Sequence, residues 1–210
     1  MKKKIYFLRH GECESNATGE PYLGKEARLT NQGIEEVKGC IPTVRKLNID
    51  TFVSSSSIRA QQTAEIISEE KSEAIVITDL FTEREHPSEL IGVKHEDVYF
   101  TDVKRQVKEL FIQKKSFSDE ENFDDLVARS ESFKIFLESM TGETILVVGH
   151  GRFTKFFLAY LCFGKDLTPE IIIRIDEFAK SSNLGLSEVA YDTDSKNWLL
   201  KQWNAMLISA

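Results

Sequence analysis

Short apolar runs alternate along this chain with stretches in which apolar residues recur every three or four positions. Such runs are typical of buried strands, and such stretches are typical of amphipathic helices. The pattern predicts strands at residues 5–8, 51–53, 75–77 and 144–148. Helices are expected at about 30–47, from the serine run at 54–57 to residue 67, and at about 153–163. This alternation favours parallel strands joined by helical crossovers.

From residue 81 to about residue 140 the pattern is first polar and then helical, with helices expected around 103–112 and 123–140. We interpret this region as an insertion over the sheet that shapes substrate choice. Two further apolar runs, at 186–191 and 198–203, predict a closing β-hairpin. The expected fold is a three-layer α/β/α sandwich with a mostly parallel central sheet and a helical insertion at about residues 81–140. We expect one domain over residues 1–210.

Composition narrows the class of partner. The hydrophobic content of 41% over 210 residues suffices for a sizeable core. A net charge of -7 argues against a nucleic-acid or membrane-surface binder, so an anion site must be a local basic pocket. No apolar stretch is long enough to span a membrane, and the run at 5–8 is too short for an export signal. Three cysteines without a CxxC pair fit a reducing cytoplasm.

Basic and imidazole side chains follow three of the expected strands. Arg9 and His10 come after the first strand, Arg59 after the second, and His150 after the strand at 144–148. Ligands of open α/β sheets bind at this edge, and two guanidinium groups suit bidentate phosphate binding. The expected site also includes two glycines that let the backbone approach the anion and one amide donor: Gly11, Gly151 and Asn16.

These residue types favour phosphoryl transfer through a histidine. The arginines disfavour the imidazolium form, so His10 should stay neutral and able to attack phosphorus, with its other ring nitrogen held by a backbone acceptor. His150, protonated against the bound anion, would stabilise the equatorial oxygens. An acid must protonate the leaving oxygen and later take a proton from water. Glu83 is the candidate acid, and Glu85 is the alternative.

The run Leu-Arg-His-Gly-Glu that ends at Glu12, together with Asn16, resembles the signature of the histidine phosphatase superfamily, which includes cofactor-dependent phosphoglycerate mutases. Residues 29–33, 54–64, 148–151, 183–186 and 191–192 resemble further elements of that family, in the same order. The resemblance implies a phosphohistidine at His10, phosphate contacts from Arg9, Arg59 and His150, and a carboxylate acid after the third strand.

Two positions depart from the family pattern. Cys13 stands where serine or threonine is common, and Arg152 stands where a small residue is common. Arg152 either extends the positive pocket toward a second anionic group of the substrate or points to solvent. His86 and His95 are expected at the surface, the serine run only as a helix cap, and Lys2 to Lys4 as a solvated strand start.

The function expected from these observations is a phosphomonoester hydrolase, a histidine acid-type phosphatase, acting on a small phosphorylated metabolite. No cofactor and no metal are expected, because two guanidinium groups make the pocket electrostatically wrong for a divalent cation. The alternatives are a cofactor-dependent phosphoglycerate mutase-type phosphotransferase and a catalytically silent phosphate-binding protein. The mixed charge of the insertion favours hydrolysis over the mutase. The identity of the metabolite and the oligomeric state stay open.

Overall fold

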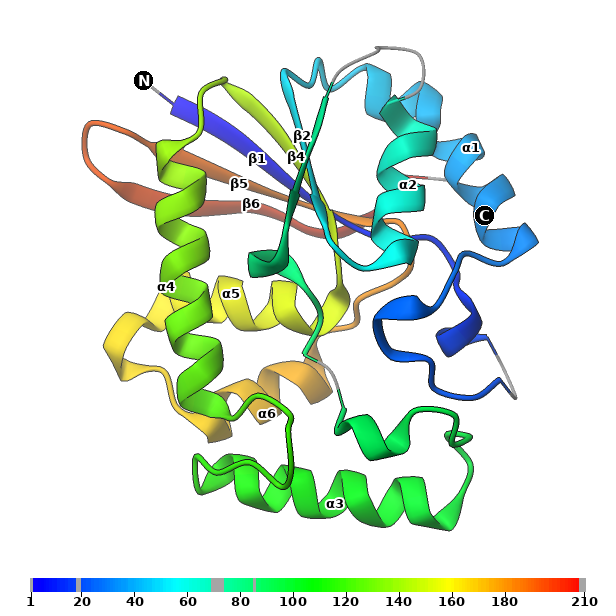
Figure 1. Ribbon diagram of the computed structural model, residues 1–210. Coiled ribbons are helices and arrows are strands. Elements are labelled where there is room, and N and C mark those ends of the chain that lie inside the picture. Colours follow the sequence, from blue (N-terminus) through cyan, green and yellow to red (C-terminus); the bar gives the residue numbers. More distant parts are fainter. Residues whose placement is uncertain (1, 18–19, 69–73, 85, 208–210) are drawn as a thin grey trace.

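A computed structural model describes residues 2–17, 20–68, 74–84 and 86–207. Its centre is a sheet of strands in the order β3-β2-β4-β1-β5-β6 (Figure 1). The strands are β1 (Lys2–Arg9), β2 (Thr51–Ser55), β3 (Ile75–Thr78), β4 (Thr144–Gly149), β5 (Gly185–Asp192) and β6 (Asn197–Met206). The first four are parallel to one another, and β5 and β6 run antiparallel at one edge. The predicted parallel strands and the closing hairpin are therefore confirmed.

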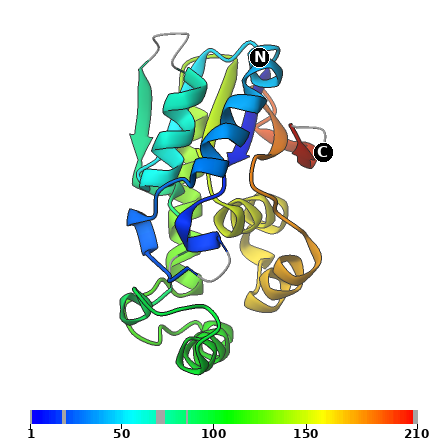
Figure 2. The same ribbon diagram turned by 90° about the vertical axis from the view of Figure 1, so that its right-hand side faces the viewer.

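Helices cover both faces of the sheet (Figures 1 and 2). On one face α1 (Asn31–Arg45) and α2 (Ile58–Ser68) pack against Leu8, Phe52 and Val148. On the other face α4 (Phe123–Ser139) and α5 (Gly151–Phe163) pack against Phe7 and Val147. Alternate residues of one strand thus enter opposite cores, as the period of two dictates. This arrangement confirms the expected three-layer sandwich.

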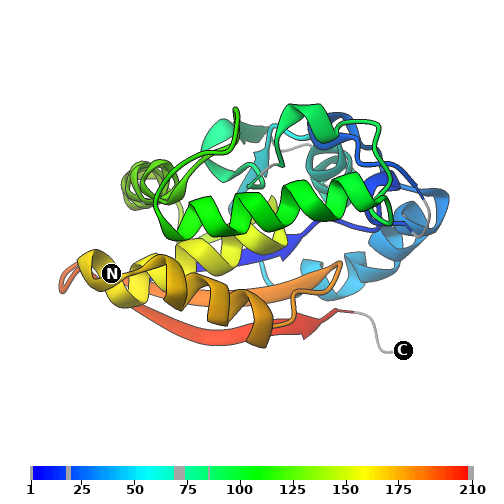
Figure 3. The same cartoon turned by 90° about the horizontal axis from the view of Figure 1, so that it is seen from below.

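The expected insertion divides into two parts. α4 lies on a face of the sheet, whereas α3 (Val98–Ile112) lies beyond the strand ends, alongside α6 (Pro169–Phe178) (Figures 1 and 3). α3 begins earlier than expected because the Asp97 side chain accepts a hydrogen bond from the Tyr99 amide. α6 was not among the expected helices, although Thr168 caps it and Pro169 occupies its first turn.

Two local expectations can be compared with the structure. Thr30 does cap α1, because its side chain accepts a hydrogen bond from the Gly33 amide. Lys3, however, is not simply solvated: its ammonium group donates to the carbonyls of Leu137, Glu138 and Met140 at the end of α4. The lysine therefore satisfies carbonyls that the helix itself leaves without partners. None of the described helices has the length and apolar character needed to cross a membrane.

Candidate active site

The carboxyl ends of β1 and β4 meet at a cavity of about 290 Å³. Arg9 pairs with Gly149 in the strand register, and the His10 amide donates to the Gly149 carbonyl at 2.9 Å. The cavity is lined by Arg9, His10 and Arg59, among others. We call it the first cavity. Side chains that are distant in sequence meet here because parallel strands end at one edge.

His10 is held in one tautomer by its neighbours. Its Nδ1 lies 2.7 Å from the Gly11 carbonyl oxygen, which can only accept, so Nδ1 carries the proton. Nε2 therefore keeps its lone pair and accepts a hydrogen bond from Arg59 Nε at 3.2 Å. Burial, followed by the charges of Arg59 and Arg9, holds the pKa of His10 well below its usual value. The imidazole is consequently neutral, with its unprotonated nitrogen toward Arg59.

Arg59 connects the two imidazoles. It lies in the first turn of α2, and its side chain is almost fully buried. Nη1 donates to the Gly24 carbonyl at 2.6 Å, and Nη2 lies 3.4 Å from His150 Nδ1. The guanidinium is thus oriented on three sides, with His10 as the third partner.

His150 is fully buried behind this arginine, and its Nε2 lies 2.8 Å from the Ser55 hydroxyl. Since Arg59 can only donate, Nδ1 of His150 is the acceptor and Nε2 carries the proton. Burial and the charge of Arg59 hold the pKa of His150 well below its usual value. His150 is therefore neutral when no anion is bound, and its protonation against a bound anion stays a prediction.

The serine run is more than a helix cap. Ser54 and Ser55 belong to β2, Ser55 contacts His150, and the Ser56 hydroxyl donates to the Asp79 carboxylate. The expectation of a cap alone was wrong because β2 continues two residues past its apolar part. The position of Ser55 at a strand end was the signal that could have identified it.

Arg9 lies across the cavity, where its Nη1 donates to the Ser181 carbonyl at 2.6 Å. Its Nε is buried without a hydrogen-bond partner among the described residues. Burial lowers the pKa of Arg9, although Glu83 partly offsets this. A buried donor without a partner is costly, so Arg9 is ready to bind an anion.

The two glycines differ in role. A Cβ on Gly151 would lie 2.8 Å from Ser181 Oγ, so glycine permits the close approach of Ser181, whose carbonyl holds Arg9. A Cβ on Gly11 would instead meet Val37 at 2.8 Å, and the Gly11 amide donates to Thr63. Gly11 therefore permits packing against α1, and its approach to the anion stays a prediction.

Glu83 lines the first cavity and is anchored by backbone groups. Its Oε1 accepts from the amides of Phe153 at 2.8 Å and Arg84 at 3.0 Å, and its Oε2 accepts from the Arg152 amide at 3.1 Å. Two of these donors belong to the first turn of α5, where a carboxylate is electrostatically favoured. Glu85, the alternative acid, lies outside the described residues.

Asn16 and Cys13 also line the first cavity. The side-chain oxygen of Asn16 accepts from the Cys13 amide at 2.8 Å, and its amide nitrogen donates to Asn183 at 3.1 Å. The Asn16 side chain thus joins the loop after β1 to the loop before β5. Cys13 is buried, and this burial raises the pKa of its thiol.

Arg152 and His86 extend the site away from the sheet. Arg152 Nη1 lies 3.4 Å from His86 Nε2, and its Nε lies 3.9 Å from Asp176. His86 was expected at the surface, but it is half-buried against Tyr22 and Phe100. Burial and the charge of Arg152 lower the pKa of His86 to about 3.

His95 is exposed, as expected, but it also lines the first cavity. Its Nε2 lies 3.0 Å from the Ser15 carbonyl oxygen. In the described part of the chain, no three His, Cys, Asp or Glu side chains gather closely enough to hold a metal ion.

Two arginines and a neutral imidazole at the carboxyl edge of a parallel sheet characterise an α/β protein that can bind and transfer phosphate. The chain belongs to the histidine phosphatase superfamily, branch 1, whose family model matches residues 5–205. This match confirms the resemblance drawn from the sequence.

Three individual proteins show the range of the similarity. The Schizosaccharomyces pombe protein named Probable phosphatase C1620.13 is 29% identical to this chain over 79% of its residues. The match spans only 59% of the length of the Schizosaccharomyces pombe protein. A 2,3-bisphosphoglycerate-dependent phosphoglycerate mutase of Azorhizobium caulinodans is 24% identical over a match that covers 83% of this chain and 87% of the mutase. The crystal structure of the alpha-ribazole phosphatase from Shigella flexneri has a TM-score of 0.80 at 22% identity, covering 99% and 98% of the two chains.

Proposed function

We propose that this protein is a phosphomonoester hydrolase that forms a phosphohistidine on His10. The geometry of His10 carries this proposal. Its Nδ1 is tied to the Gly11 carbonyl, which leaves the lone pair of Nε2 beside Arg59 in a cavity that Arg9 also lines. A neutral imidazole oriented in this way can attack phosphorus, while the guanidinium groups bind the phosphate oxygens.

The reaction would proceed in two steps. Nε2 of His10 attacks phosphorus and the ester P–O bond breaks. Glu83, which takes up a proton from solvent before this step, gives that proton to the leaving oxygen. Water then attacks the phosphohistidine and gives a proton to Glu83, and the P–N bond breaks to release phosphate. Arg9 and Arg59, with His150 behind Arg59, stabilise the charge on the transferring group. The anchored position of Glu83 beside the first cavity supports its assignment as the acid.

A phosphoglycerate mutase-type phosphotransferase is the second candidate, because the Azorhizobium caulinodans relative is such a mutase. The two activities differ in what accepts the phosphoryl group from His10. In the hydrolase the acceptor is water, and in the mutase it is a hydroxyl group of the bound phosphoglycerate. We favour the hydrolase and a small phosphorylated metabolite as its substrate, which agrees with the two relatives that are named phosphatases.

The experiment compares phosphate release from phenyl phosphate with isomerisation of 3-phosphoglycerate, with and without 2,3-bisphosphoglycerate. We expect phosphate release that depends on His10 and is absent in His10→Asn, which excludes a contaminating phosphatase. Fast isomerisation with negligible phosphate release would show a mutase. Phosphate binding without either reaction would show a catalytically silent binding protein, and both outcomes would overturn the proposal.

A further inference from the structure

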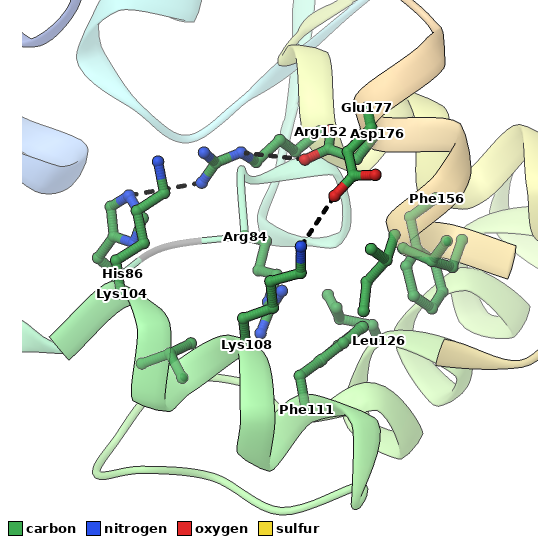
Figure 4. Close-up of a pocket in the computed structure, with 13 residues that line it drawn as sticks. Arg84, His86, Lys104, Lys108, Phe111, Leu126, Arg152, Phe156, Asp176 and Glu177 are labelled. Atoms are coloured by element: carbon green, nitrogen blue, oxygen red, sulfur yellow. Dashed lines mark hydrogen bonds and ion pairs between the residues drawn. The ribbon is translucent and has the colours of Figure 1, made fainter. Parts of the chain in front are cut away.

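A second cavity of about 300 Å³ adjoins the first one (Figure 4). It is lined by residues of α3, α4, α5 and α6, and three of its lining residues also line the first cavity: Arg84, His86 and Arg152. A molecule whose phosphate occupies the first cavity can therefore extend past these three side chains into the second. Glu83, the proposed proton donor to the leaving oxygen, accepts hydrogen bonds from the amides of Arg84 and Arg152, so the second cavity lies on the leaving-group side.

One wall of the second cavity is apolar. It consists of Val107, Phe111, Leu126, Phe156 and Ile172. Phe111 and Leu126 are buried members of the main core, so this wall is fixed by packing and is not formed by mobile surface side chains. An apolar or aromatic body would be removed from water against this wall.

A cation lies against this apolar wall. The Arg84 guanidinium stacks on the Phe111 ring at 3.9 Å and makes no side-chain hydrogen bond or ion pair within the described ranges. Burial, followed by the nearby charge of Arg152, lowers the pKa of Arg84 to about 10, although Glu120, Glu121 and Asp176 partly offset this. Lys104, which lies beside His86 in Figure 4, also lines the cavity and makes no ion pair in the described part of the chain, although the charge of Asp176 acts on it.

The other charges of this cavity are already paired. Lys108 lies 2.8 Å from Glu177, and Arg152 lies near Asp176, which also pairs with Lys155. The two carboxylates are thus engaged by other cations, and no carboxylate of the described residues forms an ion pair with Arg84. A half-buried guanidinium against an apolar wall suits a carboxylate or phosphate on an apolar body.

We propose that the second cavity binds the leaving group of the substrate, and that this group has an apolar or aromatic body and a second anionic group held by Arg84 and Lys104. The inference rests on the proposed hydrolase function. It narrows the substrate class to phosphomonoesters of amphiphilic, acidic alcohols.

The test compares two naphthyl phosphates of equal size by their kcat/KM values. One ester carries a carboxylate on the ring far from the phosphate, and in the other a neutral carboxamide replaces that carboxylate. A naphthalene bisphosphate, used in a separate arm, distinguishes a second phosphate from a carboxylate. We expect the parent protein to prefer an anionic ester over the amide by roughly ten- to a hundredfold, the usual value of a charge-assisted contact.

Two variants assign this preference to the cavity. Arg84→Gln and Lys104→Gln should each reduce the ratio of anionic to neutral ester severalfold or more. Arg105→Gln removes the same charge from α3 but lies outside the cavity, exposed and paired with Asp102 and Glu109, so it should keep the parent ratio. Comparing ratios within each variant removes any general loss of active protein.

Binding of naphthalene-2-carboxylate, measured by calorimetry, reports on the second cavity without turnover. If no ester is hydrolysed but this probe binds and Arg84→Gln abolishes binding, the hydrolase proposal fails and the anion site stands. If phenyl phosphate is hydrolysed but the ratio is near one and Arg84→Gln leaves it unchanged, the inference about the second cavity is wrong.

Discussion

Replacing Glu83 by glutamine removes one hydrogen-bond acceptor from the beginning of α5 and the proposed proton donor from the first cavity. The carboxylate accepts from the amides of Arg84, Arg152 and Phe153. The carbonyl oxygen of glutamine can keep two of these donors, but its NH₂ group would then face the third. The variant therefore affects both stability and catalysis, and the two effects can be measured separately.

The stability effect follows from the lost contacts. A buried N–H without a partner costs about 1–3 kcal/mol, and the lost negative charge at the helix N-terminus costs about 0.3–1 kcal/mol. The sum centres on about 2–3 kcal/mol, which for a chain of this size lowers Tm by roughly 4–12 °C. Denaturant unfolding of the parent and of Glu83→Gln measures this difference.

The catalytic effect is expected to depend on the leaving group. General acid catalysis contributes about a hundred- to ten-thousandfold, so kcat/KM for benzyl phosphate should fall within that range in Glu83→Gln. For p-nitrophenyl phosphate, whose leaving group needs no proton, the fall should be less than about tenfold. Glu85→Gln is the neighbouring control and should lack this dependence. Equal losses with both esters, or equal effects of the two variants, would remove Glu83 as the acid.

Three further outcomes are expected. The pKa of His86 is about 3 in the folded protein and about 6.5 in the unfolded protein, so the unfolded state binds the proton first and stability is lost as pH falls below about 6.5. His86→Gln should remove up to about 2 kcal/mol of the stability loss between about pH 7 and 5. An unchanged pH profile of denaturant unfolding would contradict this. Gly149→Ala places a Cβ in steric clash with the Phe81 ring and should cost about 1–3 kcal/mol in the free energy of unfolding. A neutral result would show that the ring can move freely. Lys3→Met deprives the end of α4 of three hydrogen bonds and should destabilise the protein by about 1–3 kcal/mol. The control Lys2→Met, at an exposed position, should change the stability by no more than about 0.5 kcal/mol. Equal effects of the two variants in thermal unfolding would refute the capping role.

The parts of the fold that could be predicted are those with a local cause. The apolar runs of β1 and β4 identify buried strands because both faces of a central strand are covered. Thr30 identifies the beginning of α1 because its hydroxyl accepts from an amide three residues ahead. The meeting of Arg9, His10 and Arg59 could be anticipated because parallel strands bring their carboxyl ends to one edge.

The features that were missed depend on contacts between distant residues. Ser55 contacts His150 across 95 positions, and Lys3 contacts the end of α4 across more than 130. His86 was placed at the surface because nothing near it in the sequence indicates that Tyr22 and Phe100 cover it. α6 is an exception, because its cap and its N-terminal proline are local features that could have predicted it.

The central claim is that His10 carries the phosphoryl group, and the most direct measurement is to trap it. Protein quenched during turnover of a ³²P-labelled phenyl phosphate should contain acid-labile, base-stable label that maps to the peptide with His10. His95→Gln, a change at the exposed rim, should keep the label, and His10→Asn should lose it. Label on another residue, or full turnover by His10→Asn, would contradict the account.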